Sequence, residues 1–150
     1  FAGRRTRIKG MDDMEIAIPE VLERRDDLQF AFVGSHGRTP EVPEKYEDHV
    51  TMVGRVPEMA PYFRAADLLV LPTYNEGLPR VVTESLASGT PVLARDVADI
   101  AYATRNTFDE IQEFIDMIVD LESLPLDDVT PFTRETLKPK YVEFFESVSS

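Results

Sequence analysis

Two glutamates, Glu76 and Glu84, are separated by seven residues in a stretch suited to a ligand that carries hydroxyl groups. A helix is predicted to begin between them, near Pro79, and the first backbone amides of a helix favour a bound anion. Carboxylates beside that anion would repel it, so they make sense as acceptors for hydroxyls further along the ligand, such as those of sugars. The plainer alternative is that Glu76 caps the helix and Glu84 is a solvated helix residue.

A second candidate is a basic cluster between two glycines, at residues 3–10. It contains Arg4, Arg5, Arg7 and Lys9 in an otherwise acidic chain. Arginine can hold two phosphate oxygens at once, and lysine offers a point charge. The spacing is not that of a Walker loop. The cluster is therefore either an anion site or a solvated basic loop that balances nearby carboxylates.

Metal chemistry is not indicated by the sequence. His36 and His49 are the only histidines, they have no partner at a ligand-like spacing, and the chain has no cysteine. A zinc or thiolate site is therefore not expected, and the absence of cysteine also excludes a disulfide framework. His36 is best explained as an ordinary loop histidine, and the turn at 54–59 as a structural turn.

The segments that must position these residues alternate between apolar and amphipathic runs. Strands are predicted at 28–35, 49–54, 67–73, 91–95 and, on a weaker pattern, 101–107. Helices are predicted at 12–25, 57–66, 79–88, 108–123 and 140–148, with a polar linker at 124–131. This alternation predicts an α/β fold with a doubly wound, Rossmann-like parallel sheet in one domain, residues 1–150. In such a sheet the ligand lies at the carboxyl ends of the strands.

Two of the predicted helices carry specific expectations. In the first, Ile16, Val21 and Leu22 are expected on the buried side, and Pro19 is expected to kink the helix or delay its start. The helix at 108–123 has the clearest amphipathic pattern in the chain.

Composition excludes some classes of protein. The chain has 150 residues, of which 43% are hydrophobic, and a net charge of -12, which argues against nucleic-acid binding through a broad basic surface. No apolar run approaches the roughly 18 residues that a membrane helix needs, and no signal peptide is visible. The 12 arginines against 4 lysines suggest a salt-adapted organism. A plain acidic surface that keeps the protein soluble is the alternative.

Three motifs, in order, resemble the C-terminal, nucleotide-binding half of the GT-B glycosyltransferases, in the retaining family 4 (glycosyl transferases group 1). They are Gly3-Arg4 with Lys9-Gly10, the segment 53–73, and the pair of glutamates within "EGLPRVVTESLASGTPVLA". The closing segment "PFTRETLKPKYVEFFE" is also similar. The resemblance extends over nearly the whole chain and implies a GT-B half that binds a nucleoside-diphosphate sugar.

The resemblance implies a role for each motif. Arg4 and Lys9 would hold the donor diphosphate, together with helix amides near Val81 and Val82. No metal or cofactor is implied, since the cations supply the charge that stabilises the leaving diphosphate. Glu84 would accept hydrogen bonds from the ribose. The residues implied for the sugar are Glu76, Gly77 and Leu78, and those implied beside the base are Arg55 and Val56.

The resemblance also implies a reaction, in which a hexose moves from a donor such as a UDP- or GDP-hexose to an acceptor with retention of configuration. The acceptor could be a lipid carrier, a glycan or a small molecule. Its binding domain is expected to precede this chain, which would begin within a strand and be inactive alone. The expected location is the cytoplasm, or the inner membrane face. An epimerase-like enzyme, a phosphorylase and a non-catalytic nucleotide-sugar-binding module share the architecture and stay as alternatives.

Four residues depart from the family pattern. Ala98 and Asp99 stand where Gly-Gly is common, and the segment after them is short. Ser35 and Pro79 each replace a frequent glycine, although proline is acceptable in the first turn of a helix. The loop around Ala98 is therefore the part of the site for which the resemblance is weakest.

Overall fold

In the described part of the chain, each strand runs parallel to the strand with which it pairs, as the sequence predicts. A computed structural model describes residues 1–148, apart from the side chains of Phe145 and Val148. One sheet pairs β1 (Phe30–Val33) with β2 (Val50–Gly54), and another has the order β3 (Leu69–Leu71), β4 (Val92–Arg95), β5 (Thr107–Phe108). Because the strands within each sheet point the same way, their carboxyl ends meet at one edge of that sheet, and the sequence predicts the ligand at such ends.

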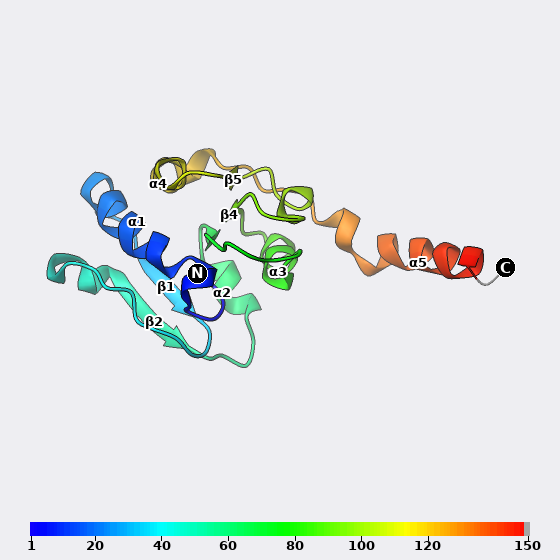
Figure 1. The fold of residues 1–150 in the computed structure, drawn as a ribbon, viewed down its shortest axis with the longest axis horizontal. Coiled ribbons are helices and arrows are strands. Elements are labelled where there is room, and N and C mark those ends of the chain that lie inside the picture. Colours follow the sequence, from blue (N-terminus) through cyan, green and yellow to red (C-terminus); the bar gives the residue numbers. More distant parts are fainter. Residues whose placement is uncertain (149–150) are drawn as a thin grey trace.

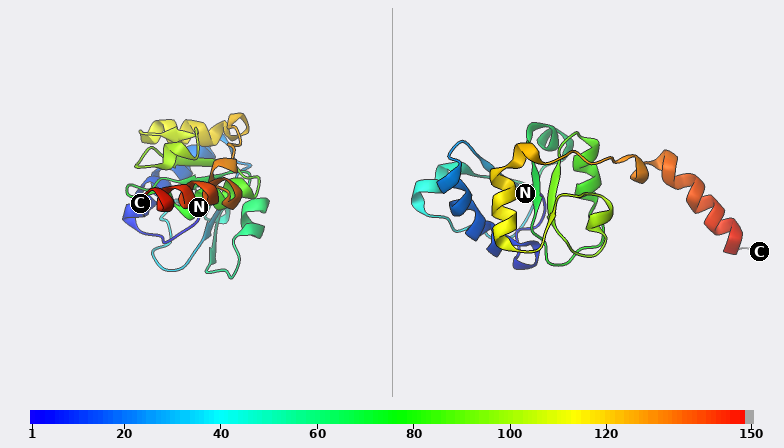
Figure 2. Two further views of the ribbon diagram at one scale, coloured as in Figure 1. Left: turned by 90° about the vertical axis from the view of Figure 1, so that its right-hand side faces the viewer. Right: turned by 90° about the horizontal axis from the view of Figure 1, so that it is seen from above.

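Helices lie on both sides of these strands (Figure 1). The α-helices are α1 (Met11–Arg24), α2 (Ala60–Ala65), α3 (Arg80–Ala87), α4 (Ile111–Val119) and α5 (Arg134–Val148). Short 3-10 helices are formed by Arg7–Lys9, Glu44–His49, Ile100–Tyr102, Leu121–Ser123 and Thr130–Phe132. Helix α5 extends away from the sheets (Figures 1 and 2). No helix in the described part of the chain is long and apolar enough to cross a membrane.

Helix α1 packs against α4, and the prediction for its buried side was partly wrong. Val21 and Leu22 are buried as expected, but the side chain of Ile16 is 52% exposed. Met14 and Ile18 are fully buried and are spaced by one helical turn, which leaves Ile16 on the opposite side. The helix does not start late, because it runs through Pro19 from its first residue.

Several predicted elements have different bounds in the structure. The strand predicted at 101–107 is wrong, because Ile100–Tyr102 forms a 3-10 helix and only Thr107 of that range pairs with β4, in a two-residue strand that ends at Phe108. Ala98 has a positive φ of 49°, and Tyr102 is 80% exposed, so the chain turns outward here. The helix predicted at 140–148 is longer than expected, whereas those predicted at 57–66 and 108–123 are shorter.

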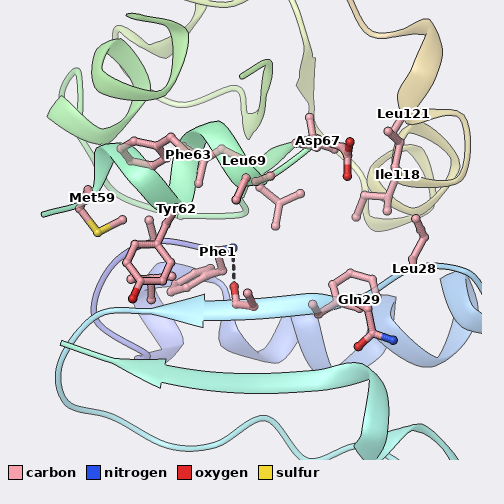
Figure 3. Close-up of a pocket in the computed structure, with 18 of the residues that line it drawn as sticks. Phe1, Leu28, Gln29, Met59, Tyr62, Phe63, Asp67, Leu69, Ile118 and Leu121 are labelled. Carbon is pink, nitrogen blue, oxygen red and sulfur yellow. Dashed lines mark hydrogen bonds between the residues drawn. The ribbon is translucent and has the colours of Figure 1, made fainter. Parts of the chain in front are cut away.

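A groove separates the two sheets. The first residues of the chain run beside β1, where the Val33 amide donates to the Phe1 carbonyl at 3.0 Å and the Gly3 amide donates to the Val33 carbonyl at 2.9 Å. Beyond them, between β1 and β3, lies a groove of about 400 Å³ (Figure 3). Apolar side chains dominate its lining, including Leu69 and Ile118. The N-terminal nitrogen donates to the Ala31 carbonyl at 3.0 Å within it.

Candidate functional site

Two loops at the carboxyl edge are bonded directly to each other. The Ile8 carbonyl, in the basic segment, accepts the Tyr74 amide at 2.9 Å and the Thr73 hydroxyl at 3.3 Å. Gly10 permits this approach, because a Cβ on it would lie 2.1 Å from the Pro72 carbonyl oxygen. Its φ of 80° also falls in the left-handed region that favours glycine. The basic segment and the loop after β3 therefore form one unit.

An ion pair between Lys9 and Glu76 lies at this junction. Their side chains are 19% and 25% exposed, so the pair is mostly shielded but still open to solvent on one side. The sequence predicted roles for both residues in one ligand site, and the fold brings them into contact. Gly77 and Leu78 follow Glu76, and Leu78, like Val81 of α3, packs against the apolar core that contains Leu71 and Val82.

Four of the predicted donor residues line a separate cavity of about 290 Å³. They are Arg4, Arg55, Val56 and Val81. They come from the basic segment, from the turn after β2 and from the first turn of α3. Because these elements are distant in sequence, the cavity is created by the fold and could not be found from residue spacing. Ser35, which departs from the family pattern, also lines it.

The first turn of α3 offers fewer free amides than the sequence suggests. The Val82 amide donates to the Pro79 carbonyl at 3.0 Å, and the Val82 side chain is fully buried. The Val82 amide is therefore already engaged in this structure, and the assignment of the amides near Val81 and Val82 to a phosphate stays a prediction. Arg80 and Val81 come before that bond, so their amides are the ones left to face an anion.

Glu84 forms an ion pair with Arg80 one turn earlier on the same helix, at 2.8 Å. The Arg80 side chain is 91% exposed and that of Glu84 is 37% exposed. An exposed pair of this spacing contributes little to stability, typically about 0.3–0.5 kcal/mol. Glu84 can therefore exchange this partner for a ligand at small cost.

The other cations of the basic segment do not face the same way. The guanidinium of Arg5 donates to the Gly34 carbonyl at 2.8 Å and to the Arg38 carbonyl at 3.0 Å, so Arg5 ties two loops together. Arg7 is 89% exposed and pairs with Asp12 at 3.0 Å. The cluster is thus divided, because only Arg4 and Lys9 lie beside the cavity or the ion pair described above.

Sequence reasoning missed a buried network on the other side of the same loop. Arg95, at the end of β4, pairs with Asp13 of α1 at 2.6 Å, and their side chains are 12% and 8% exposed. The Tyr74 hydroxyl donates to the same carboxylate at 2.8 Å. Asp13 was interpreted only as an acidic residue at a helix start, and no spacing rule links it to a residue 82 positions away.

No cluster of three or more potential metal ligands exists among the residues that the structure describes. His49 instead contacts the Leu28 carbonyl through Nδ1 at 2.8 Å.

The sequence of this chain matches the family described as glycosyl transferases group 1 over residues 1–122. The chain belongs to this family. This group 1 glycosyltransferase domain is 36% identical over 103 residues to TuaC of Bacillus subtilis, which is named as a putative teichuronic acid biosynthesis glycosyltransferase. It is 33% identical over 122 residues to a D-inositol 3-phosphate glycosyltransferase of Streptomyces scabiei. These matches cover 67% and 71% of this chain but only 25% and 27% of the relatives.

Solved structures show that the domain has the fold of a GT-B half. A pneumococcal O-GlcNAc transferase, GtfA, in complex with UDP and GlcNAc, superposes with a TM-score of 0.78 at 17% identity, covering 98% of this chain and 35% of that one. Anabaena HepE in complex with UDP gives a TM-score of 0.67 at 17% identity, covering 97% and 48%. The group 1 domain therefore spans about a quarter of its curated relatives and under half of these structures.

Proposed function

We propose that this domain binds the nucleoside-diphosphate sugar in a retaining hexosyltransferase. The observation that carries the proposal is the contact between Lys9 and Glu76, together with a cavity that Arg4 and Arg55 line. Together, these residues supply cations for a diphosphate and a carboxylate for sugar hydroxyls. The relatives are named glycosyltransferases, which favours transfer over epimerisation, phosphorolysis or binding alone.

In the proposed complex, Lys9 and Arg4 take the diphosphate, and the amides of Arg80 and Val81 add the positive end of the helix dipole. As the bond to the sugar breaks, negative charge builds up on the departing diphosphate, and fixed cations stabilise that charge. No metal is required in this scheme. Glu76 then exchanges its lysine partner for hydroxyls of the sugar, with Gly77 and Leu78 offering backbone groups.

The nucleoside occupies the remaining part of the edge. Glu84 accepts hydrogen bonds from the ribose hydroxyls once Arg80 releases it, and the base lies beside Arg55 and Val56. UDP is the first nucleotide to test, because two of the similar structures are described as UDP complexes. A UDP- or GDP-hexose is the donor class, and the acceptor is a lipid carrier, a glycan or a small molecule. The expected location, cytoplasmic or at the inner membrane face, follows from that donor and acceptor chemistry.

Transfer requires more polypeptide than this chain, and the groove between β1 and β3 supports that part of the proposal. Both strands turn an edge toward it, with apolar side chains between them. Polypeptide that precedes Phe1 would add a parallel strand there, which would join the two sheets into one. Adding a strand-forming extension before Phe1 should raise the thermal midpoint of unfolding, whereas an extension with alternating prolines, which cannot pair, should not. Equal midpoints would remove this support.

Calorimetric titration of the domain with UDP, GDP and ADP, and then with their hexoses, tests the donor proposal. We expect one nucleotide to bind and its hexose conjugate to bind more tightly. A folded domain, as checked by circular dichroism, that binds none of them would refute the proposal.

A further inference from the structure

The most shielded charge pair at the carboxyl edge contains no residue to which the proposed function gives a role. Arg95 pairs with Asp13 at 2.6 Å and donates to the Asp109 carbonyl at 2.5 Å. Its guanidinium lies 4.4 Å from the ring centre of Tyr74 and 4.8 Å from that of Phe108. The arginine is therefore clamped between two rings, a carboxylate and a backbone oxygen.

This arrangement is unfavourable as a purely stabilising device. A buried ion pair recovers little of the free energy lost when its charges leave water, and an apolar replacement is often as stable. The Nε atom of Arg95 is also buried without a hydrogen-bond partner in the described structure, which adds a further penalty. Such a pair is best explained by what it holds in place.

What it holds is Tyr74. The Tyr74 hydroxyl donates to Asp13 at 2.8 Å, its ring lies on Arg95, and its amide donates to the Ile8 carbonyl at 2.9 Å. Burial and the bond to Asp13 raise the pKa of this hydroxyl, so it stays a donor at neutral pH. The residue is nevertheless 50% exposed, so burial of apolar surface does not account for its three attachments.

Those attachments lie next to the proposed chemistry. Ile8 immediately precedes Lys9, and Tyr74 is two residues before Glu76. A shift of Tyr74 would move the first part of the loop that carries Glu76 relative to the segment that carries Lys9. Positioning errors of this kind can reduce turnover without removing any group that touches the substrate.

We propose that Tyr74, held by Asp13 and Arg95, is a positioning residue that sets Glu76 against Lys9 for the sugar donor. This inference rests on the proposed function for its consequence, but its structural part stands on the network alone. Tyr74 acts through Glu76 and contacts no substrate itself.

Hydrogen exchange tests the structural part. In the Tyr74→Phe variant the ring stays on Arg95 but the bond to Asp13 is lost, so the Tyr74 amide, which donates to the Ile8 carbonyl, should exchange several-fold faster. Tyr102→Phe is the matched control, because the Tyr102 side chain is 80% exposed and its hydroxyl has no bond in the described structure. Unchanged exchange in Tyr74→Phe, or an equal change in the control, would overturn the proposal. Asp13→Asn provides a second variant that disturbs the same bond.

A double-mutant cycle in the longer protein tests the consequence. Tyr74→Phe should lower kcat/KM for the donor by roughly three- to tenfold, the loss typical of one hydrogen bond. In the Glu76→Gln background the same change should lower it no further, because the residue that Tyr74 positions is already impaired. A purely structural role would give the same loss in both backgrounds and would contradict the proposal. If the wild-type protein binds and transfers no sugar, the proposed function fails, while exchange still decides whether the network sets the loop.

Discussion

Lys9 and Glu76 are 67 residues apart in sequence and form an ion pair at the carboxyl edge of the sheet. Each is the other's partner, so the site holds no uncompensated charge at this point. If a donor binds as proposed, the lysine gains a phosphate and the carboxylate gains hydroxyls at the same moment. The two residues therefore report on different parts of one ligand, which allows them to be separated by experiment.

Lys9→Ala should weaken binding of both UDP and UDP-hexose, whereas Glu76→Gln should weaken only the hexose conjugate. A hydrogen bond to a charged group is worth about 1.5–3 kcal/mol, so each affected affinity should fall by roughly 10- to 100-fold. Calorimetry with both ligands measures this. Lys45→Ala is the control, because Lys45 also pairs with a glutamate, Glu23, and both side chains are 61% exposed. A loss of UDP affinity in Glu76→Gln would contradict the division of roles.

Glu84→Gln should weaken the binding of UDP by a larger factor than the binding of 2′-deoxy-UDP. The reason is that the carboxylate is assigned to the ribose hydroxyls, one of which 2′-deoxy-UDP lacks. Arg80→Ala should lower stability by no more than about 0.5 kcal/mol, as expected for an exposed pair on one helix. It should leave UDP affinity unchanged or higher, because it frees Glu84 from its partner. Equal effects of Glu84→Gln on both nucleotides would show that this carboxylate does not contact the 2′-hydroxyl.

The sequence was enough to predict parallel strands with helices between them, because these follow from local patterns. Apolar runs gave the first four strands, and proline before α3 and glycine after it marked that helix. The same patterns failed where the chain turns locally: Ala98 adopts a positive φ, and the predicted strand after it became a 3-10 helix. Patterns of apolar and polar residues do not predict a turn of this kind.

Contacts between distant residues were beyond the sequence. The pairing of Asp13 with Arg95 spans 82 positions and depends on how α1 lies on β4, so no spacing of charges could indicate it. The sequence predicted that Lys9 and Glu76 bind parts of the same ligand, but it did not predict that they contact each other. The bond that occupies the Val82 amide depends on how tightly the first turn of α3 winds, which residue type does not determine.

Gly10→Ala should destabilise the domain by about 2–5 kcal/mol. The left-handed conformation costs an alanine about 1–2 kcal/mol, and the Cβ would overlap the Pro72 carbonyl, for which overpacking adds about 1–3 kcal/mol. Gly89→Ala is the control, because its φ of 86° is similar but a Cβ there would meet nothing within 4 Å. It should lose only about 1–2 kcal/mol. Urea unfolding of both variants measures the difference, and equal losses would mean that the two loops do not approach as closely as described.

The acidic surface predicts that the domain is more stable in molar potassium chloride than in dilute buffer. The chain has a net charge of -12, so its carboxylates repel one another across the surface. Salt shortens the range of that repulsion from about 10 Å at 0.1 M to about 3 Å at 1 M. Salt also weakens exposed ion pairs such as Arg24–Asp116, but such pairs contribute only about 0–1 kcal/mol each. Urea unfolding at both salt concentrations measures the balance, with sucrose as a non-ionic control. Equal stability at low and high salt would remove the salt-adaptation hypothesis and leave an acidic surface that serves solubility alone.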